Sequence, residues 1–94
     1  MGKRIPRRPL GKTGLEVSVL GLGGFHQVEV GQDTVDAVVD LYLAAGGNYI
    51  ETARSYGAGA SEHKLGRALG DRRNDVILAS KTGQRDAEGA WREV

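Results

Sequence analysis

The chain has 94 residues, of which 39% are hydrophobic and 27% charged, so it fits one small globular domain or part of a larger one. Its formal net charge of +1 gives no global field that would favour nucleic acid or a membrane surface as a partner. The sequence has no cysteine and two isolated histidines, which excludes disulfides and argues against a metal site. With no apolar run of membrane-spanning length and no signal-peptide core, we expect a cytoplasmic protein.

The first predicted element is a β-hairpin over residues 5–17. The Gly-Lys-Thr-Gly segment at residues 11–14 favours a turn between the extended segments 8–10 and 15–17. The apolar run that follows, 17–22, predicts a strand buried on both faces, as in a parallel sheet.

Apolar residues at helical spacing then predict a helix with Asp33 or Thr34 as its N-cap. Gly46 and Gly47 are expected to end this helix in a left-handed turn. Residues 48–52 follow as the second predicted strand.

A glycine-rich loop over residues 57–60 leads to Ser61, which is expected to cap a second helix. Residues 70–75 predict a turn, and the apolar run 76–81 predicts a third strand. A further helix is expected to begin at residues 90–94. The predicted buried stripe of the second helix is Leu65, Ala68 and Leu69.

This order of elements predicts an α/β protein with right-handed crossovers and a parallel sheet, preceded by a hairpin. Three parallel strands leave two open edges and one uncovered face. We therefore expect the chain to be a truncated part of a larger domain.

The glycine-rich segments give weak nucleotide-binding signals. Residues 21–24 begin like a dinucleotide fingerprint, but His26 stands where the third glycine belongs. Residues 11–13 resemble the end of a phosphate loop, yet Pro6 occupies the position of its first glycine. The loop before Ser61 precedes a helix N-terminus and suits an anion, although a plain turn is the favoured interpretation.

Glu51, Tyr56 and Lys81 are the strongest candidate site residues. Glu51 ends the second predicted strand, Tyr56 follows it, and Lys81 ends the third. Because ligands bind at the carboxyl ends of parallel strands, we expect the three side chains to converge there. A tyrosine beside a carboxylate and a lysine suits proton donation to a carbonyl. The alternative is a buried Glu–Lys ion pair with a packing tyrosine, and spacing alone leaves both open.

Several segments together resemble the aldo-keto reductase family. Residues 8–18 (RPLGKTGLEVS) and 20–24 (LGLGG) resemble the opening of that family. Residues 49–57 (YIETARSYG), with Ser-Glu and Leu-Gly in 61–66, resemble its signature around the catalytic tyrosine. Residues 77–81 (ILASK) resemble its lysine-bearing strand. These matches run in order across essentially the whole chain.

The resemblance implies a (β/α)8 TIM barrel whose N-terminal end is closed by a hairpin. Such a barrel needs roughly 250 residues, so residues 1–94 would be a partial aldo-keto reductase domain: the hairpin and the first three β/α units. The active-site histidine of the family lies on the next strand, and neither His26 nor His63 matches its motif. The residues that grip the cofactor phosphates would also lie further along the chain.

The resemblance also implies a function, the reduction of small aldehydes and ketones to alcohols with NADPH, or NADH as the alternative. Tyr56 would be the proton donor, and Lys81 would assist because a nearby cation favours a phenolate. Glu51 would pair with the lysine beside the nicotinamide ribose. The residues expected to line the nicotinamide pocket are Gly23, Gly24 and Phe25.

One residue departs from the family pattern, because aspartate is usual where this chain has Glu51. The extra methylene either disturbs the pairing with Lys81 or is absorbed. A non-catalytic relative, serving in nucleotide binding or regulation, is therefore a second hypothesis. A third is a barrel assembled from several short chains. The 94-residue chain alone is expected to show little or no activity.

Overall fold

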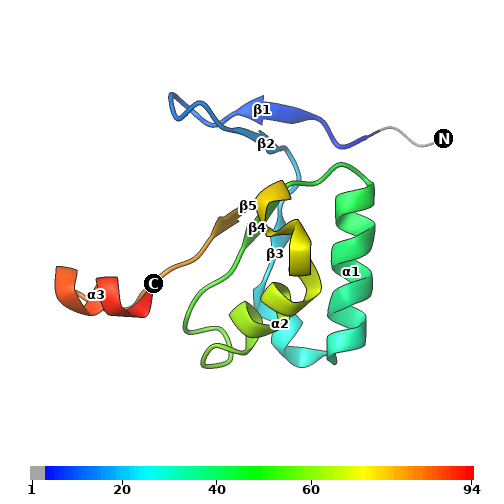
Figure 1. Ribbon diagram of the computed structural model, residues 1–94. Helices are drawn as coiled ribbons and strands as arrows, with labels where there is room; N and C mark the ends of the chain where they lie inside the picture. Colours follow the sequence, from blue (N-terminus) through cyan, green and yellow to red (C-terminus); the bar gives the residue numbers. More distant parts are fainter. Residues whose placement is uncertain (1–3) are drawn as a thin grey trace.

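The computed structural model describes residues 4–94. Two short antiparallel strands come first, and a three-stranded parallel sheet with helical crossovers follows (Figure 1). The elements in chain order are β1 (Arg7–Pro9), β2 (Glu16–Ser18), β3 (Leu22–Gly23), the 3-10 helix η1 (Phe25–Glu29), α1 (Gln32–Ala44), β4 (Tyr49–Glu51), α2 (Ala60–Leu69), the 3-10 helix η2 (Gly70–Asp75), β5 (Ile77–Ala79) and α3 (Ala87–Glu93).

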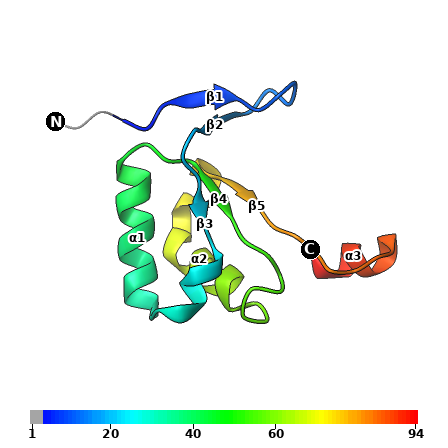
Figure 2. The ribbon, with the colours of Figure 1, turned by 180° about the vertical axis from the view of Figure 1, so that it is seen from behind.

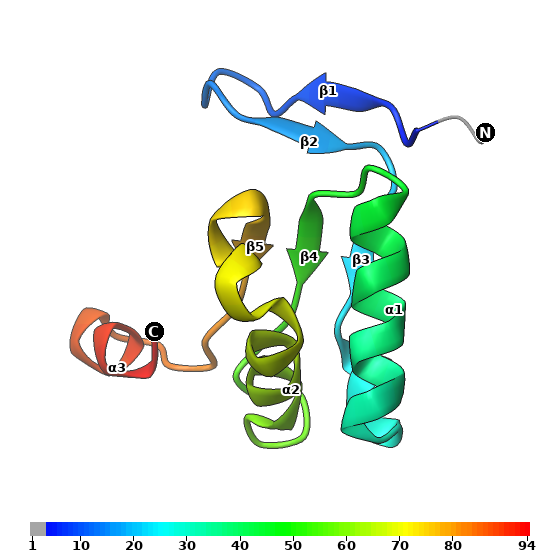
Figure 3. The same ribbon diagram turned by 45° about the vertical axis from the view of Figure 1, so that its right-hand side comes forward.

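Strands β1 and β2 pair antiparallel, with Arg8 opposite Val17. The amide of Leu10 donates to the carbonyl of Leu15 over 2.8 Å, and the intervening turn contains Gly14 at φ +81°. A glycine suits that left-handed conformation because it has no Cβ. The pair lies at the amino ends of the parallel strands, away from the edge where they end (Figure 3).

The prediction of one continuous strand over residues 17–22 is wrong. The chain leaves β2 after Ser18 and enters β3 only at Leu22. The amide of Ser18 donates to Asn48 Oδ1 over 2.7 Å, and its hydroxyl donates to the carbonyl of Leu20 over 2.9 Å. These bonds bend the backbone between the two sheets, which leaves the Leu20 side chain 60% exposed.

Two predicted helix caps are also wrong. Helix α1 begins after Gly31, whose carbonyl accepts the first amides of the helix, so Asp33 and Thr34 lie within the first turn. Helix α2 begins after Gly59, at φ +99°, which places Ser61 inside the helix. Glycine occupies both N-cap positions, and no side chain makes a capping bond at either one.

The predicted end of α1 at its glycine pair is confirmed. Gly46 has φ +99°, and its amide donates to the carbonyl of Leu43 over 3.0 Å. The amide of Gly47 donates to the carbonyl of Tyr42 over 2.9 Å. This pair of bonds is a Schellman motif, which reverses the chain and delivers it directly into β4.

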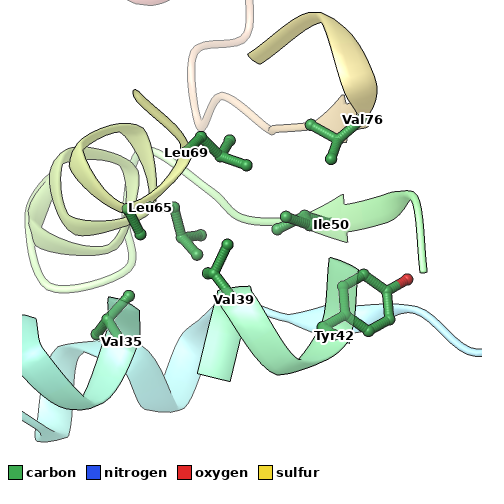
Figure 4. Close-up of a cluster of buried hydrophobic side chains, with 8 residues drawn as sticks. Val35, Val39, Tyr42, Ile50, Leu65, Leu69 and Val76 are labelled. Carbon is green, nitrogen blue, oxygen red and sulfur yellow. The ribbon is translucent and has the colours of Figure 1, made fainter. Parts of the chain in front are cut away.

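The parallel sheet has the order β3-β4-β5, with Ile50 opposite both Leu22 and Leu78. Helices α1 and α2 pack on the same face of this sheet (Figure 3), and from behind the strands lie in front of α2 (Figure 2). Between sheet and helices lies a cluster of buried side chains (Figure 4), which includes the predicted stripe of α2. The members of this cluster are Val35, Val39, Tyr42, Ile50, Leu65, Ala68, Leu69 and Val76.

The last helix, α3, begins three residues earlier than the predicted residue 90, at Ala87. The carboxylate of Asp86 accepts the amide of Gly89 over 2.6 Å, which is the N-cap bond that the sequence interpretation missed. Helix α3 lies beside the sheet rather than on it (Figure 1). Its Trp91 is 82% exposed. Within residues 4–94, none of the helices has the length and hydropathy to cross a membrane.

Candidate active site

Glu51, Tyr56 and Lys81 meet at the carboxyl edge of the parallel sheet. Glu51 is the last residue of β4, and Lys81 follows the end of β5 by two residues. Lys81 Nζ donates to Glu51 Oε2 and, over 3.0 Å, to the hydroxyl oxygen of Tyr56. The Tyr56 hydroxyl donates to Glu51 Oε2 over 3.2 Å. The register that pairs Glu51 with Ala79 brings the strand ends together.

The Lys81 ammonium has all three of its donors engaged. Besides Glu51 and Tyr56, it donates to the carbonyl of Thr52 over 2.9 Å. The same nitrogen lies 4.7 Å from the centroid of the Tyr56 ring, within the range of a cation–π contact. These bonds fix a positive charge directly beside the phenol oxygen.

Glu51 and Lys81 each shift the pKa of the other toward the charged form. The hydrogen bond from Lys81 is the main cause that holds the pKa of Glu51 below its ordinary 4.5, with bonds from the Gly24 amide and Tyr56 adding to it against the opposing effect of burial. Glu51 and then Tyr56 raise the pKa of Lys81 above its ordinary 10.5. Both side chains are therefore ionised at neutral pH. With 31% and 53% exposed, they form a partly hydrated pair and not a buried one.

The other carboxylate oxygen of Glu51 faces the loop after β3. Glu51 Oε1 accepts the amide of Gly24 over 3.1 Å. One carboxylate thus reaches Gly24, Tyr56 and Lys81 together, so the extra methylene of glutamate does not break the pairing. A Cβ on Gly24 would lie 2.4 Å from the Glu51 carbonyl, whereas a Cβ on Gly23 would meet only Glu51 Oε1, at 3.7 Å. Only glycine therefore fits at position 24.

Phe25 stands beside the tyrosine. It opens η1, and its ring lies edge-on to the Tyr56 ring, with centroids 5.3 Å apart and 84° between the planes. The side chain is 48% exposed. His26 is hydrogen bonded to Glu29 Oε1 over 2.8 Å, on the surface of η1. The arrangement leaves a half-exposed aromatic face next to the phenol.

Sequence reasoning missed the contribution of Ser61. Its buried hydroxyl donates to the carbonyl of Gly24 and lies next to Thr52 Oγ1, each over 2.7 Å. The cap interpretation assigned this hydroxyl to its own helix. The signal that could have found it is the position of Ser61 within the same signature segment as Tyr56.

The residues present fit the nicotinamide riboside part of a cofactor. Glu51 Oε1 accepts one amide, and an ionised carboxylate oxygen has lone pairs for a second donor such as a sugar hydroxyl. The bare backbone of Gly23 and the half-exposed ring of Phe25 border that oxygen and the phenol. Over the described residues, no group of three His, Cys, Asp or Glu side chains is placed to hold a metal ion.

The sequence pattern of the aldo/keto reductase family matches residues 19–94. The chain therefore belongs to the aldo/keto reductase family, as the resemblance of its motifs predicted.

Relatives and solved structures agree with this assignment. An uncharacterized oxidoreductase, YqkF, of Bacillus subtilis is 34% identical over 84 residues, covering 89% of this chain and 27% of the relative. Pyridoxal 4-dehydrogenase of Microbacterium luteolum is 34% identical over 86 residues, covering 87% and 25%. The holo form of an aldo-keto reductase from Bacillus halodurans matches with a TM-score of 0.79 and 37% identity, covering 92% of this chain and 28% of that one.

The chain thus spans about a quarter of the length of these curated relatives (27% and 25%).

Proposed function

We propose that the protein carrying this sequence reduces aldehydes or ketones to alcohols with NADPH, with NADH as the alternative cofactor. Tyr56, Lys81 and Glu51 are the groups that handle the proton. The observation that carries the proposal is the phenol of Tyr56 bonded at once to the ammonium of Lys81 and the carboxylate of Glu51. Membership of the aldo/keto reductase family supports the same class of reaction.

The bound cofactor would supply the hydride that reaches the carbonyl carbon. The Tyr56 hydroxyl turns from Glu51 Oε2 to the substrate carbonyl oxygen and donates its proton to that oxygen. With hydride on the carbon and a proton on the oxygen, the product is an alcohol. The resulting phenolate faces the Lys81 ammonium at 3.0 Å, and an adjacent cation stabilises that anion. Glu51 keeps the ammonium charged and in place, and solvent returns a proton to the phenolate.

The proposed cofactor contacts are Gly23, Gly24, Phe25 and Glu51. A Cβ on Gly23 would meet only Glu51 Oε1, at 3.7 Å, so the space beside this residue is open, and we assign it to the nicotinamide ring. Glu51 Oε1 would accept a ribose hydroxyl in addition to the Gly24 amide. Phe25 would border the nicotinamide on the side of the phenol.

We further propose that residues 1–94 work as the first part of a (β/α)8 barrel. The open three-stranded sheet, covered by helices on one face, supports this proposal, as does the greater length of the relatives. The hairpin would close the amino end of that barrel. On this account the 94-residue chain by itself turns over little or no substrate.

The test uses the natural polypeptide that carries this sequence, NADPH deuterated at the transferable position, and a reactive aldehyde. The expected product is an alcohol with deuterium on the former carbonyl carbon, formed at an ordinary enzymatic rate. A protein that binds NADPH but yields no deuterated alcohol from a panel of aldehydes and ketones would be a non-catalytic relative, and the proposal would be wrong.

A further inference from the structure

Ser61 contacts Gly24, at the border of the candidate site, and is fully buried, at 0% exposure. It is the second residue of α2, and its hydroxyl donates to the carbonyl of Gly24 over 2.7 Å. Thr52 Oγ1 lies 2.7 Å from the same hydroxyl oxygen. Because a serine hydroxyl has one proton, Thr52 must be the donor in that second bond. The bonds therefore run in one direction, from Thr52 to Ser61 to Gly24.

Gly24 is held on both sides of its Cα. The carbonyl of Gly24 accepts the Ser61 hydroxyl over 2.7 Å and the Gln27 amide over 3.3 Å, and the Gly24 amide donates to Glu51 Oε1 over 3.1 Å. Glycine has the greatest backbone freedom of any residue, so without such bonds its amide direction is poorly defined. Ser61 makes the shorter of these two bonds to the carbonyl, so its loss would loosen the residue whose amide orients the Glu51 carboxylate.

We propose that Ser61 is a positioning residue of the candidate site. Its hydroxyl fixes Gly24, and the Gly24 amide then holds the Glu51 carboxylate in the orientation that presents Oε2 to Tyr56 and Lys81. The effect on turnover rests on the proposed function, whereas the effect on Glu51 does not.

Other residues in the N-terminal half of α2 hold the helix to the same edge of the sheet. Glu62 Oε2 accepts the hydroxyl of Ser80, the neighbour of Lys81, over 2.6 Å. Lys64 Nζ donates to three backbone carbonyls in and just after η1. They belong to Gln27 at 3.3 Å, Val28 at 3.3 Å and Val30 at 2.7 Å. Because this half of the helix is anchored to the segments that follow β3, β4 and β5, the position of Ser61 is fixed.

The test compares Ser61→Ala with Ser18→Ala in the natural polypeptide. Ser18 is the matched control because it is also buried, at 4% exposure, and its hydroxyl bonds to Tyr42 and Leu20 at the opposite end of the sheet. The measurement is the titration of the Glu51 carboxyl carbon by NMR. Lys81 and Tyr56 are the ionisable groups that face this carboxyl.

Ser61→Ala is expected to raise the pKa of Glu51, because a weakened Gly24 bond no longer favours the charged form. Ser18→Ala is expected to leave the pKa of Glu51 at its wild-type value. An unchanged titration in Ser61→Ala, or an equal change in both variants, would overturn the positioning role.

A second substitution covers the case in which Ser61→Ala does not fold. Ser61→Cys keeps a side chain of similar shape, slightly larger than serine, but is a weak donor, so it is expected to move the titration in the same direction. Both Ser61 variants are also expected to lower kcat, by up to about 100-fold where the carboxylate shifts by about 1 Å. The titration of Glu51 needs no turnover, so it decides the role of Ser61 even if the wild-type protein reduces no aldehyde. A lack of aldehyde reduction by the wild type would count only against the proposed function.

Discussion

The ammonium nitrogen of Lys81 lies 3.0 Å from the phenol oxygen of Tyr56, although 25 residues separate the two in the chain. They meet because β4 and β5 are adjacent and parallel, so the segments that follow both strands emerge at one edge of the sheet. A fixed cation at hydrogen-bonding distance from a phenol favours the phenolate that is left once the proton has been given away.

Lys81→Met should remove the charge that stabilises the phenolate while keeping most of the side-chain volume. We expect kcat for aldehyde reduction to fall by at least about 100-fold, the usual effect of deleting one group that stabilises a developing anion. Lys12→Met, in the exposed turn between β1 and β2, is the matched control and should leave kcat unchanged. Equal kinetics for wild type and Lys81→Met would contradict the assigned role.

Glu51 should make stability depend on pH on the acid side. Its pKa in the folded chain lies below the ordinary 4.5, so its stabilising effect is fully present above pH 4.5 and is lost as the pH falls through the folded value. Urea unfolding across this range should show wild type losing its advantage over Glu51→Gln as the solution becomes more acidic.

The control for this experiment is Glu88→Gln, which breaks the exposed pair with Arg92 on α3. Because exposed pairs contribute little, its difference from wild type should change much less with pH. If the Glu51→Gln difference stayed constant from neutral pH to well below pH 4.5, the ion pair would not stabilise the fold.

Neighbouring glycines should respond differently to alanine. Gly24→Ala would place a methyl group 2.4 Å from the Glu51 carbonyl, so the backbone must shift at a cost of about 1–3 kcal/mol. Gly23→Ala meets only Glu51 Oε1, at 3.7 Å, and should leave the free energy of unfolding nearly unchanged.

On the proposed function, Gly23→Ala should instead raise KM for NADPH, because its methyl group points into the space assigned to the nicotinamide. Thermal or urea unfolding together with KM measurements separates the two effects. Equal destabilisation by both substitutions would contradict the claim that a Cβ is tolerated at position 23 and excluded at position 24.

Much of the architecture was predictable from local patterns. Residues 48–52 carry the apolar and extended pattern of a strand, and the pair Gly46 and Gly47 marks the end of α1 with the turn that the structure contains. The meeting of Glu51 and Lys81 followed from topology, since both side chains stand at the carboxyl ends of predicted parallel strands.

Tertiary contacts account for what the sequence did not reveal. The apolar run 17–22 has the composition of one strand, yet β2 ends within it and β3 begins within it. The break occurs because the side chain of Asn48, which is distant in the chain, accepts the amide of Ser18. Serine is a residue type typical of N-caps, which is why the sequence favours Ser61 as the cap of α2. Gly59 occupies the N-cap position instead, and the Ser61 hydroxyl donates to the carbonyl of Gly24, in the loop after β3. Bonds between distant residues leave no periodic signal in the sequence.

The most direct test of the central claim is the substitution Tyr56→Phe, which removes only the proposed proton donor. Tyr49→Phe is the matched control, because it removes a phenol hydroxyl from β4 outside the Glu51–Lys81 pair. Steady-state reduction of a reactive aldehyde by NADPH should fall by about 100-fold or more in Tyr56→Phe, with cofactor affinity and the free energy of unfolding close to those of wild type. Aldehyde reduction by Tyr56→Phe at the rate of wild type and of Tyr49→Phe would contradict the account.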